Sequence, residues 1–284
     1  MSGKKSLEEL RLPKAHYDEH GYGIFRNVLD AALVEEARQH VDWLLERNPG
    51  TRPEQLHHFL MTDDPFWVRL ISDDRLLDIA EQFIGPNLAL FASHYIAKRP
   101  KDGQEVLWHQ DGSYWPLEPM VVVTLWLAID DSDQENGCMR VIPDTHNTKL
   151  LTEDELQQRP DATNVLGSGI DPATIDEARA VDVVLKAGDV SVHHPNLIHG
   201  SKANLSNRWR RGLTIRYIPT STRIITAEAF PSAFILRGET VAGVNRYQRW
   251  PQFMEGRHKP FAGTAEWNLK CQVVNDRYRA SLVT

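Results

Sequence analysis

Hydrophobic residues in the first third of the chain recur with helical spacing. Between residues 30 and 47 apolar side chains fall every three or four positions, which predicts an amphipathic helix. Asp30 stands where an N-cap is expected, and the sequence NPG ends the helix. The same pattern predicts a second helix over residues 74–84, closed by Gly85 and Pro86.

From residue 88 onward the pattern changes to β-branched and aromatic runs separated by Gly, Pro, Asn and Asp, which predicts strands. The runs cover residues 88–100, 105–111, 120–130, 138–143, 180–194 and 211–219. A polar insertion, 144–179, interrupts them, and within it TEDELQQR predicts a short helix. Helices followed by many short strands indicate an α+β fold, with a mainly β core built as a sandwich or barrel.

The chain's 284 residues, 41% of them hydrophobic, can bury a sizeable core. We find neither an internal repeat nor a low-complexity linker, so we expect one domain over residues 1–284. Within it, residues 1–86 would form a helical N-terminal support and 87–219 the β core. Residues 220–284 look irregular and rich in aromatic side chains, and we expect them to pack on the core as a C-terminal extension.

Charge and targeting signals narrow the cellular setting. The formal net charge is −7, and the basic residues are scattered except for RWRR at 208–211, so we expect no nucleic-acid partner. The chain has two cysteines far apart in sequence, which are too few for a disulfide framework. We see no secretory signal, no membrane span and no peroxisomal C-terminus, and therefore predict a cytoplasmic protein.

The sequence WHQD contains a candidate half of a metal site. On an extended chain, residues i and i+2 point the same way, so His109 and Asp111 can face one point while Gln110 faces outward. Imidazole and carboxylate are the ligands of oxygen-activating iron(II). His109 and Asp111 alone are weak evidence for a metal site, and the alternative is that they belong to a polar turn.

A third ligand and an anion-binding residue follow later in the chain. His199 ends a predicted strand, and Gly200 beside it leaves room for close backbone approach. Arg210 begins the next strand, and arginine grips a carboxylate with two parallel hydrogen bonds. Within RWRR, Arg208 and Arg211 are alternatives for this role. Three potential iron ligands followed by a carboxylate-binding residue are a far more specific indication of an iron site than the histidine–aspartate pair or the arginine alone.

The blocks WHQD, NGCMRVIPDTH, GDVSVHHPNLIHGS and WRRGLTIRYIP resemble, in this order, the phytanoyl-CoA dioxygenase-like family. The resemblance runs from about residue 15 to about residue 219. It implies a double-stranded β-helix, the jelly-roll barrel also found in cupins, supported by N-terminal helices. It also implies an Fe(II)- and 2-oxoglutarate-dependent dioxygenase that uses O2, with ascorbate as reductant. Such an enzyme hydroxylates a small organic metabolite and releases succinate and CO2.

The resemblance implies roles for individual residues. His109, Asp111 and His199 would be the iron ligands and the catalytic centre. Arg210 would hold the distal carboxylate of 2-oxoglutarate, and Ser201 would assist it unless it only forms a turn.

Further residues are candidates for the pocket. Trp126 would line the cosubstrate site, although packing in the core is an equal alternative. Tyr114 and Trp115 follow the metal motif and are candidates for substrate contacts. Arg216 shares strand parity with Arg210 and could meet a substrate anion, with a structural ion pair as the alternative.

One feature departs from the family's pattern. The phytanoyl-CoA enzymes have an upstream lysine that helps to bind the cosubstrate, whereas PEQLHHFL here offers His57 and His58. His94 and Lys98 are weaker site candidates, and a position facing solvent is the alternative for Lys98. His193 reads as an ordinary core or surface histidine.

Two other functions stay open at this point: a catalytically silent member of the same fold that binds a ligand, and a cupin-like metalloenzyme that does not use 2-oxoglutarate. We expect a small-molecule substrate, free rather than carrier-bound, because no basic surface for the phosphates of coenzyme A is visible. The protein would act as a monomer or a homodimer.

Overall fold

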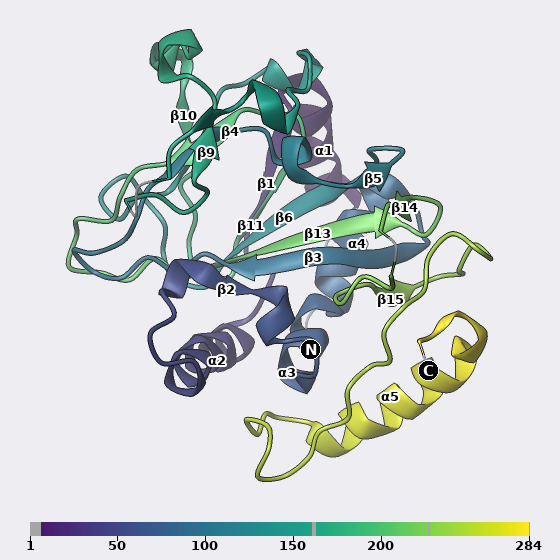
Figure 1. The fold of residues 1–284 in the computed structure, drawn as a ribbon. Helices are drawn as coiled ribbons and strands as arrows, with labels where there is room; N and C mark the ends of the chain where they lie inside the picture. The colour runs from purple at the N-terminus through teal and green to yellow at the C-terminus, as the bar shows by residue number, and fades with distance from the viewer. Residues whose placement is uncertain (1–6, 161–162, 227, 284) are drawn as a thin grey trace.

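The computed structural model describes residues 7–160, 163–226 and 228–283, and two antiparallel sheets form its centre (Figure 1). The large sheet contains, in spatial order, β1 (Tyr22–Phe25), β11 (Val190–His193), β6 (Val123–Ala128), β13 (Gly212–Pro219), β3 (Leu88–Tyr95) and β15 (Phe234–Arg237), and β2 (Leu56–His57) also pairs with β3. The small sheet contains β10 (Val181–Asp182), β7 (Met139–Val141), β12 (His199–Ser201) and β4 (Val106–His109). The predicted jelly-roll core is confirmed.

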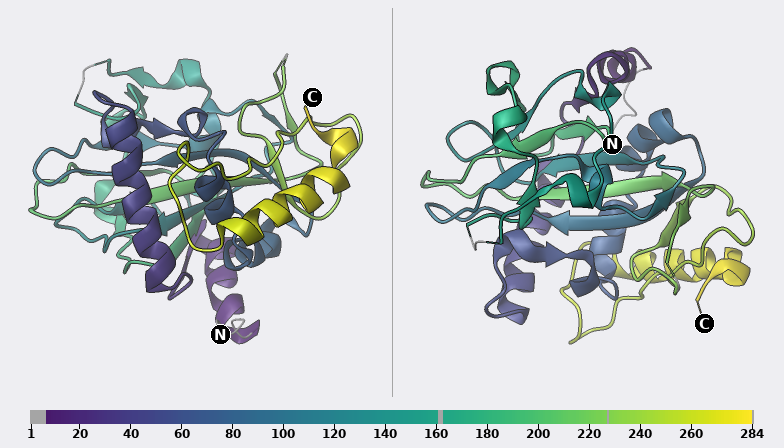
Figure 2. Two further views of the ribbon diagram at one scale, coloured as in Figure 1. Left: turned by 90° about the horizontal axis from the view of Figure 1, so that it is seen from below. Right: turned by 45° about the horizontal axis from the view of Figure 1, so that its top comes forward.

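Two short ribbons, five α-helices and eight 3-10 helices complete the described elements. The ribbons are β5 (Leu117–Glu118) with β14 (Arg223–Ile224), and β8 (Gln157–Gln158) with β9 (Ser168–Gly169). The helices are α1 (Leu7–His20), α2 (Ala31–Arg47), α3 (Pro65–Ile71), α4 (Asp74–Ile84) and α5 (Thr264–Arg277). Figures 1 and 2 show α2 and α3 on one side of the large sheet and the small sheet on the other.

The alternation of side chains along β6 and β13 separates the hydrophobic core from the site. Leu125 and Ile215 belong to a hydrophobic cluster that includes residues of α2, α3 and α4. Thr214 and Arg216, one position away on β13, line a cavity on the opposite face together with Trp126 of β6. Because successive side chains of a strand point to opposite faces, one face supports the fold and the other carries the polar residues.

The two predicted helices are confirmed as α2 and α4. The Asp30 carboxylate accepts a hydrogen bond from the Leu33 backbone N–H at 3.0 Å, as an N-cap does. Sequence periodicity missed α1, α3 and α5. Helix α1 contains Pro13, α3 has only seven residues, and α5 buries only two side chains, so none has a strong amphipathic pattern.

Two local predictions are wrong. The segment 152–159 forms a single 3-10 turn, Glu153–Glu155, because the Thr152 and Glu155 side chains cap that turn reciprocally. The next residues then pair as strand β8 with β9 instead of continuing a helix. The C-terminal segment is not irregular throughout, since it contains β14, β15 and α5.

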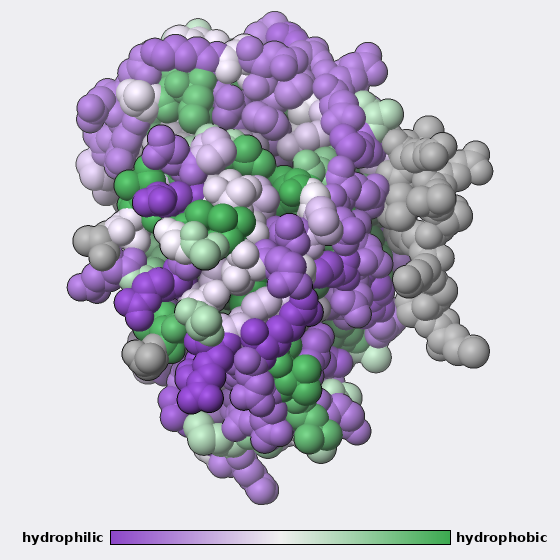
Figure 3. Space-filling view, turned by 90° about the vertical axis from the view of Figure 1, so that its right-hand side faces the viewer, coloured by the Kyte–Doolittle hydropathy of each residue, from purple (hydrophilic) through white to green (hydrophobic). Residues whose placement is uncertain are grey.

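The C-terminal segment packs against the hydrophobic core through aromatic rings. Trp250 and Trp267 stack with ring centroids 5.2 Å apart, and both belong to the cluster beneath the large sheet. On the outside of α5, Leu269 and Val273 are exposed. Figure 3 shows this side of the molecule, where hydrophobic residues form several separate patches. The described residues contain no helix long and apolar enough to cross a membrane.

Candidate metal centre and cosubstrate pocket

Two histidines and one aspartate converge between the two sheets. In the pairing of β12 with β4, His199 lies directly opposite His109, and their ring centroids are 4.1 Å apart. One potential ligand atom each from His109, Asp111 and His199 lie within 4.8 Å of one another, and all three residues are buried. The structure thus brings together the three predicted ligands, which are separated by 88 residues (199 − 111) at their longest gap.

The position of Asp111 differs from the prediction in one respect. Strand β4 ends at His109, and Asp111 begins a 3-10 turn, Asp111–Tyr114. The carboxylate still faces the histidines, since its Oδ1 lies 3.5 Å from His109 Nε2.

Backbone carbonyls orient both histidine rings. His109 Nδ1 donates to the Leu107 carbonyl at 2.7 Å, and His199 Nδ1 donates to the Leu197 carbonyl at 2.9 Å. With Nδ1 occupied, each ring can offer Nε2 to a metal, which is the usual outer-shell arrangement of metal-binding histidines.

The charge states of His199 and Asp111 also suit a metal. Burial, and then His109 and His193, hold the pKa of His199 well below its usual range. Burial opposes ionisation of Asp111, but the neighbouring Arg216, His109 and His193 outweigh it and keep the pKa of Asp111 well below its usual range. Neutral imidazole and ionised carboxylate are the forms that bind metal.

Gln110 was predicted to face outward, and this prediction is wrong. Its side chain is only 1% exposed. Its amide nitrogen donates to the carbonyls of Lys149 and Asn196 at 3.2 and 2.8 Å, and its oxygen accepts from the Leu151 N–H at 3.0 Å. Because a buried amide needs hydrogen-bond partners, Gln110 ties the metal motif to the insertion and to the loop before β12.

Arg210 and Lys98 form a buried pair of cations beside the triad. Arg210 is 2% exposed, and its guanidinium carbon lies 5.2 Å from the Trp126 ring centroid. Ser201 Oγ accepts from Lys98 Nζ at 2.7 Å and from Arg210 Nη2 at 3.4 Å. Arg210 Nε is buried without a hydrogen-bond partner. In the described part of the chain, no carboxylate lies within ion-pair distance of either cation, so the pair can receive an anionic ligand.

Of the two positions left open for Lys98, the structure excludes the one facing solvent. The chain after β3 continues alongside the start of β13, where Lys98 N donates to the Arg210 carbonyl at 2.9 Å. This backbone pairing carries the side chain under β12, where it is fully buried. Burial, and then the neighbouring Arg210, hold the pKa of Lys98 well below its usual range.

The structure distinguishes the three arginines of RWRR. Arg208 lies at the surface and pairs with Asp133 at 2.7 Å. Arg211 pairs with Asp42 and Asp130 at 3.1 and 3.2 Å. Arg210 is therefore the arginine of the three that enters the pocket, as predicted.

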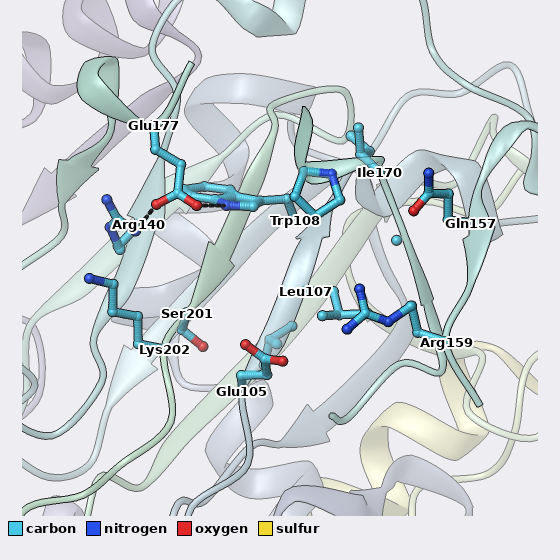
Figure 4. Close-up of a pocket in the computed structure, with 13 residues that line it drawn as sticks. Glu105, Leu107, Trp108, Arg140, Gln157, Arg159, Ile170, Glu177, Ser201 and Lys202 are labelled. Atoms are coloured by element: carbon cyan, nitrogen blue, oxygen red, sulfur yellow. Dashed lines mark hydrogen bonds and ion pairs between the residues drawn. The ribbon is translucent and has the colours of Figure 1, made fainter. Parts of the chain in front are cut away.

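A small cavity of about 50 Å³ joins the triad to Arg210. Its lining includes His94, Trp126, Ser201, Thr214 and Arg216. A larger hollow of about 270 Å³ lies on the outer face of the small sheet. Figure 4 shows Trp108 at its centre, beside Arg140 and Glu177. We place the chemistry in the smaller cavity, because Trp108 alternates with His109 along β4 and points away from the triad.

Comparison with known proteins assigns the family. A sequence model of the phytanoyl-CoA dioxygenase (PhyH) family matches residues 17–212. The chain belongs to this family. Peroxisomal phytanoyl-CoA dioxygenase of Bos taurus is 32% identical over 247 residues, which cover 78% of this chain and 71% of that protein. The Rattus norvegicus protein of the same name is 29% identical over 294 residues, covering 95% and 82%.

Solved structures related to this phytanoyl-CoA dioxygenase family member share its fold. A non-heme monooxygenase, ThoJ, has a TM-score of 0.70 at 23% identity, covering 93% of this chain and 95% of its own. EctD from S. alaskensis, solved with bound Fe, has a TM-score of 0.66 at 20% identity, covering 84% and 91%. The non-heme alpha ketoglutarate dependent carbocyclase SnoK has a TM-score of 0.59 at 25% identity, covering 78% and 87%.

The three predicted substrate residues of this family member lie near the triad. Tyr114 has its ring centroid 6.2 Å from that of His109, and its hydroxyl lies 3.1 Å from Ser168 Oγ in the insertion. The Arg216 guanidinium carbon lies 5.3 Å from the Trp115 ring centroid. Thus Tyr114 connects the triad to the insertion, and Trp115 with Arg216 forms a separate side of the site.

Sequence reasoning missed His193. This residue is 1% exposed, and its Nε2 lies 3.4 Å from Asp111 Oδ2. Thr124, its partner in the pairing of β11 with β6, has its Oγ1 3.4 Å from the same oxygen. Strand parity along β11 could have indicated that His193 faces inward, but it could not show what lies opposite.

Proposed function

We propose that this protein is an Fe(II)- and 2-oxoglutarate-dependent dioxygenase that hydroxylates a small organic substrate. The observation that carries the proposal is one small cavity that joins a His–Asp–His cluster to Arg210 and to Ser201, whose hydroxyl also contacts the buried Lys98. Bound iron and 2-oxoglutarate would supply the oxidising chemistry with O2, and succinate and CO2 would leave as products.

The residues of the triad would hold the metal. His109 and His199 would offer Nε2 and Asp111 one carboxylate oxygen, a set that suits non-heme iron(II) and leaves positions on the metal open. The carbonyl hydrogen bonds to both Nδ1 atoms would fix the ring orientations before the metal arrives. Burial of all three side chains would limit the access of water.

The second group of residues would bind the cosubstrate's distal carboxylate. Arg210 lines the cavity and its Nε has no hydrogen-bond partner, and a carboxylate can accept two parallel N–H groups of a guanidinium. Ser201 and Lys98 would complete the clamp, and the Trp126 ring would hold the guanidinium in place. These unpaired cations favour 2-oxoglutarate over a cupin-like metalloenzyme that takes no oxo acid.

The relatives support the cosubstrate assignment. A protein from Stutzerimonas stutzeri, named a probable alpha-ketoglutarate-dependent hypophosphite dioxygenase, is 29% identical over 148 residues, covering 52% of this chain and 51% of its own. We further propose one domain over residues 1–284, a cytoplasmic location, and ascorbate as the reductant that sustains turnover.

An anaerobic titration tests the function directly. Protein with Fe(II) should develop a weak visible charge-transfer band when 2-oxoglutarate is added. His199→Ala should abolish it, whereas His20→Ala, on α1, should leave it unchanged. Succinate formed under O2, with and without ascorbate, then separates a turning-over enzyme from a silent binding protein. Absence of the band in the wild-type protein would exclude the assignment.

A further inference from the structure

Arg216 has far more hydrogen-bonding capacity than the structure uses. Within the described residues its polar contacts are a hydrogen bond from Nη1 to Thr214 Oγ1 at 2.8 Å and a separation of 3.7 Å between Nη2 and Asp111 Oδ1. Its Nε is buried and has no hydrogen-bond partner. A guanidinium carries five N–H donors, and a buried cation without a closely bound anion is costly.

Asp111 cannot be the full partner of Arg216 if the proposed function is right. In that function the Asp111 carboxylate is an iron ligand, so its charge is directed toward the metal. The distal carboxylate of 2-oxoglutarate would be bound by Arg210 and Lys98. Arg216 lies six positions further along the same chain segment than Arg210 and is separated from it by Thr214 on the same face. Arg216 is thus a separate cation that can still bind an anionic group of a ligand.

Aromatic side chains surround the free side of Arg216. Its guanidinium lies against the Trp115 ring, and Trp115 meets Phe91 edge to face at 5.8 Å between centroids. Phe91 stacks on Phe230 at 5.0 Å, and His58 lies 5.5 Å from Phe230. Trp115, Phe230 and His58 are partly exposed, and the Arg216 side chain is 12% exposed, so these aromatic residues line a route between the guanidinium and solvent.

The histidines near Arg216 do not add positive charge. His57 stacks on His94 with centroids 3.8 Å apart. Burial, and then Arg216, lower the pKa of His57 and of His58, to about 4 for His58. Burial, and then His57 and Arg216, hold the pKa of His94 well below its usual range. At neutral pH these rings can donate and accept hydrogen bonds while Arg216 supplies the charge. One cation suits one negative charge, which favours a carboxylate over a doubly charged phosphate ester.

We infer that the substrate is a free carboxylic acid, whose carboxylate binds Arg216 and whose apolar skeleton packs against Trp115 and Phe230. The inference rests on the proposed function, because it takes Asp111 as a metal ligand. An amide or thioester of the same acid lacks the negative charge and would bind more weakly. An apolar skeleton on that acid agrees with the aromatic rings beside the guanidinium.

Calorimetry under anaerobic conditions tests the inference on protein loaded with Fe(II) and 2-oxoglutarate. The probes are straight-chain and aryl-substituted carboxylic acids, each paired with its primary amide. We expect the wild-type protein to bind at least one acid about tenfold or more tightly than its amide. Arg216→Met should weaken binding of that acid about 10- to 100-fold, the loss expected for charge-assisted hydrogen bonds, and leave amide binding unchanged. Arg216→Lys should retain part of the preference.

The controls separate the two proposals. Arg223→Met, at an exposed arginine on β14, should bind the acid as the wild type does. Arg216→Met should keep the charge-transfer band with 2-oxoglutarate, which reports on the proposed function alone. Equal affinity for acids and amides, no binding of any acid, or loss of the band in Arg216→Met would overturn the inference. In the last case Arg216 would serve the cosubstrate.

Discussion

Replacing Arg210 with methionine should change cosubstrate binding and protein stability in opposite directions. Burial lowers the pKa of Arg210 to about 10 from an ordinary value of 12.5. Each pKa unit corresponds to about 1.4 kcal/mol, so holding this charge in the buried pocket without a bound anion costs roughly 3 kcal/mol. Because the folded-state pKa lies below the unfolded one, this cost applies at every pH below about 10.

Arg210→Met removes that cost, and a methionine of similar length can pack against Trp126. The free energy of unfolding without 2-oxoglutarate should therefore rise, by up to roughly 3 kcal/mol. The same change removes the bidentate contact to the distal carboxylate. Charge-assisted hydrogen bonds contribute about 1.5–3 kcal/mol each, so loss of two of them should raise the Kd for 2-oxoglutarate about 100- to 10,000-fold.

Two measurements decide the question. Urea unfolding without cosubstrate gives the change in stability, and anaerobic titration of the charge-transfer band gives the Kd. Arg208→Met is the matched control, because Arg208 forms an exposed surface ion pair and should alter neither quantity by much. If Arg210→Met lowered stability and left the Kd unchanged, Arg210 would be a structural residue and the cosubstrate assignment would fail.

Three further substitutions test the site and its support. Lys98→Met should raise the Kd for 2-oxoglutarate about tenfold, less than Arg210→Met does, in the same titration; an unchanged Kd would limit Lys98 to holding Ser201. Gly212→Ala would place a Cβ 2.0 Å from Trp126 Cζ2, so it should cost about 1–3 kcal/mol in urea unfolding, and a stable variant would contradict this packing. Asp30→Ala should cost about 1 kcal/mol at neutral pH through loss of the N-cap. Since the hydrogen bond from Arg75 helps to lower the pKa of Asp30 to about 2, the difference from wild type should persist above pH 4 and shrink as the pH falls toward 2, which urea unfolding across that range would show.

Local patterns were sufficient where an element has a strong periodicity or cap. Helices α2 and α4 were predicted because apolar residues repeat along one face and each helix has a clear stop signal. The strands were predicted from alternation and turn residues. Helix α5 was missed because Trp267 and Cys271 are its only buried side chains. Two buried positions do not produce a recognisable hydrophobic periodicity.

The chemistry of the candidate ligands was also visible in the chain. His109, Asp111 and His199 have the side chains that iron(II) needs, and Arg210 is the residue type that grips a carboxylate. Their order and spacing were enough to suggest the family. The sequence did not show that Lys98 and His193 belong to the same region, because nothing in their neighbouring residues distinguishes them from a surface lysine and a core histidine.

The sequence by itself determined which residues can act as ligands, which faces of the strands are apolar, and where two helices begin and end. The tertiary structure decided what lies opposite each of those faces. Pairing of β12 with β4 sets His199 against His109, and pairing of Lys98 with Arg210 buries two cations together. Such contacts join residues about a hundred positions apart. Hydrophobic periodicity indicates only which face of an element is buried, so it cannot identify the residues that pack against that face.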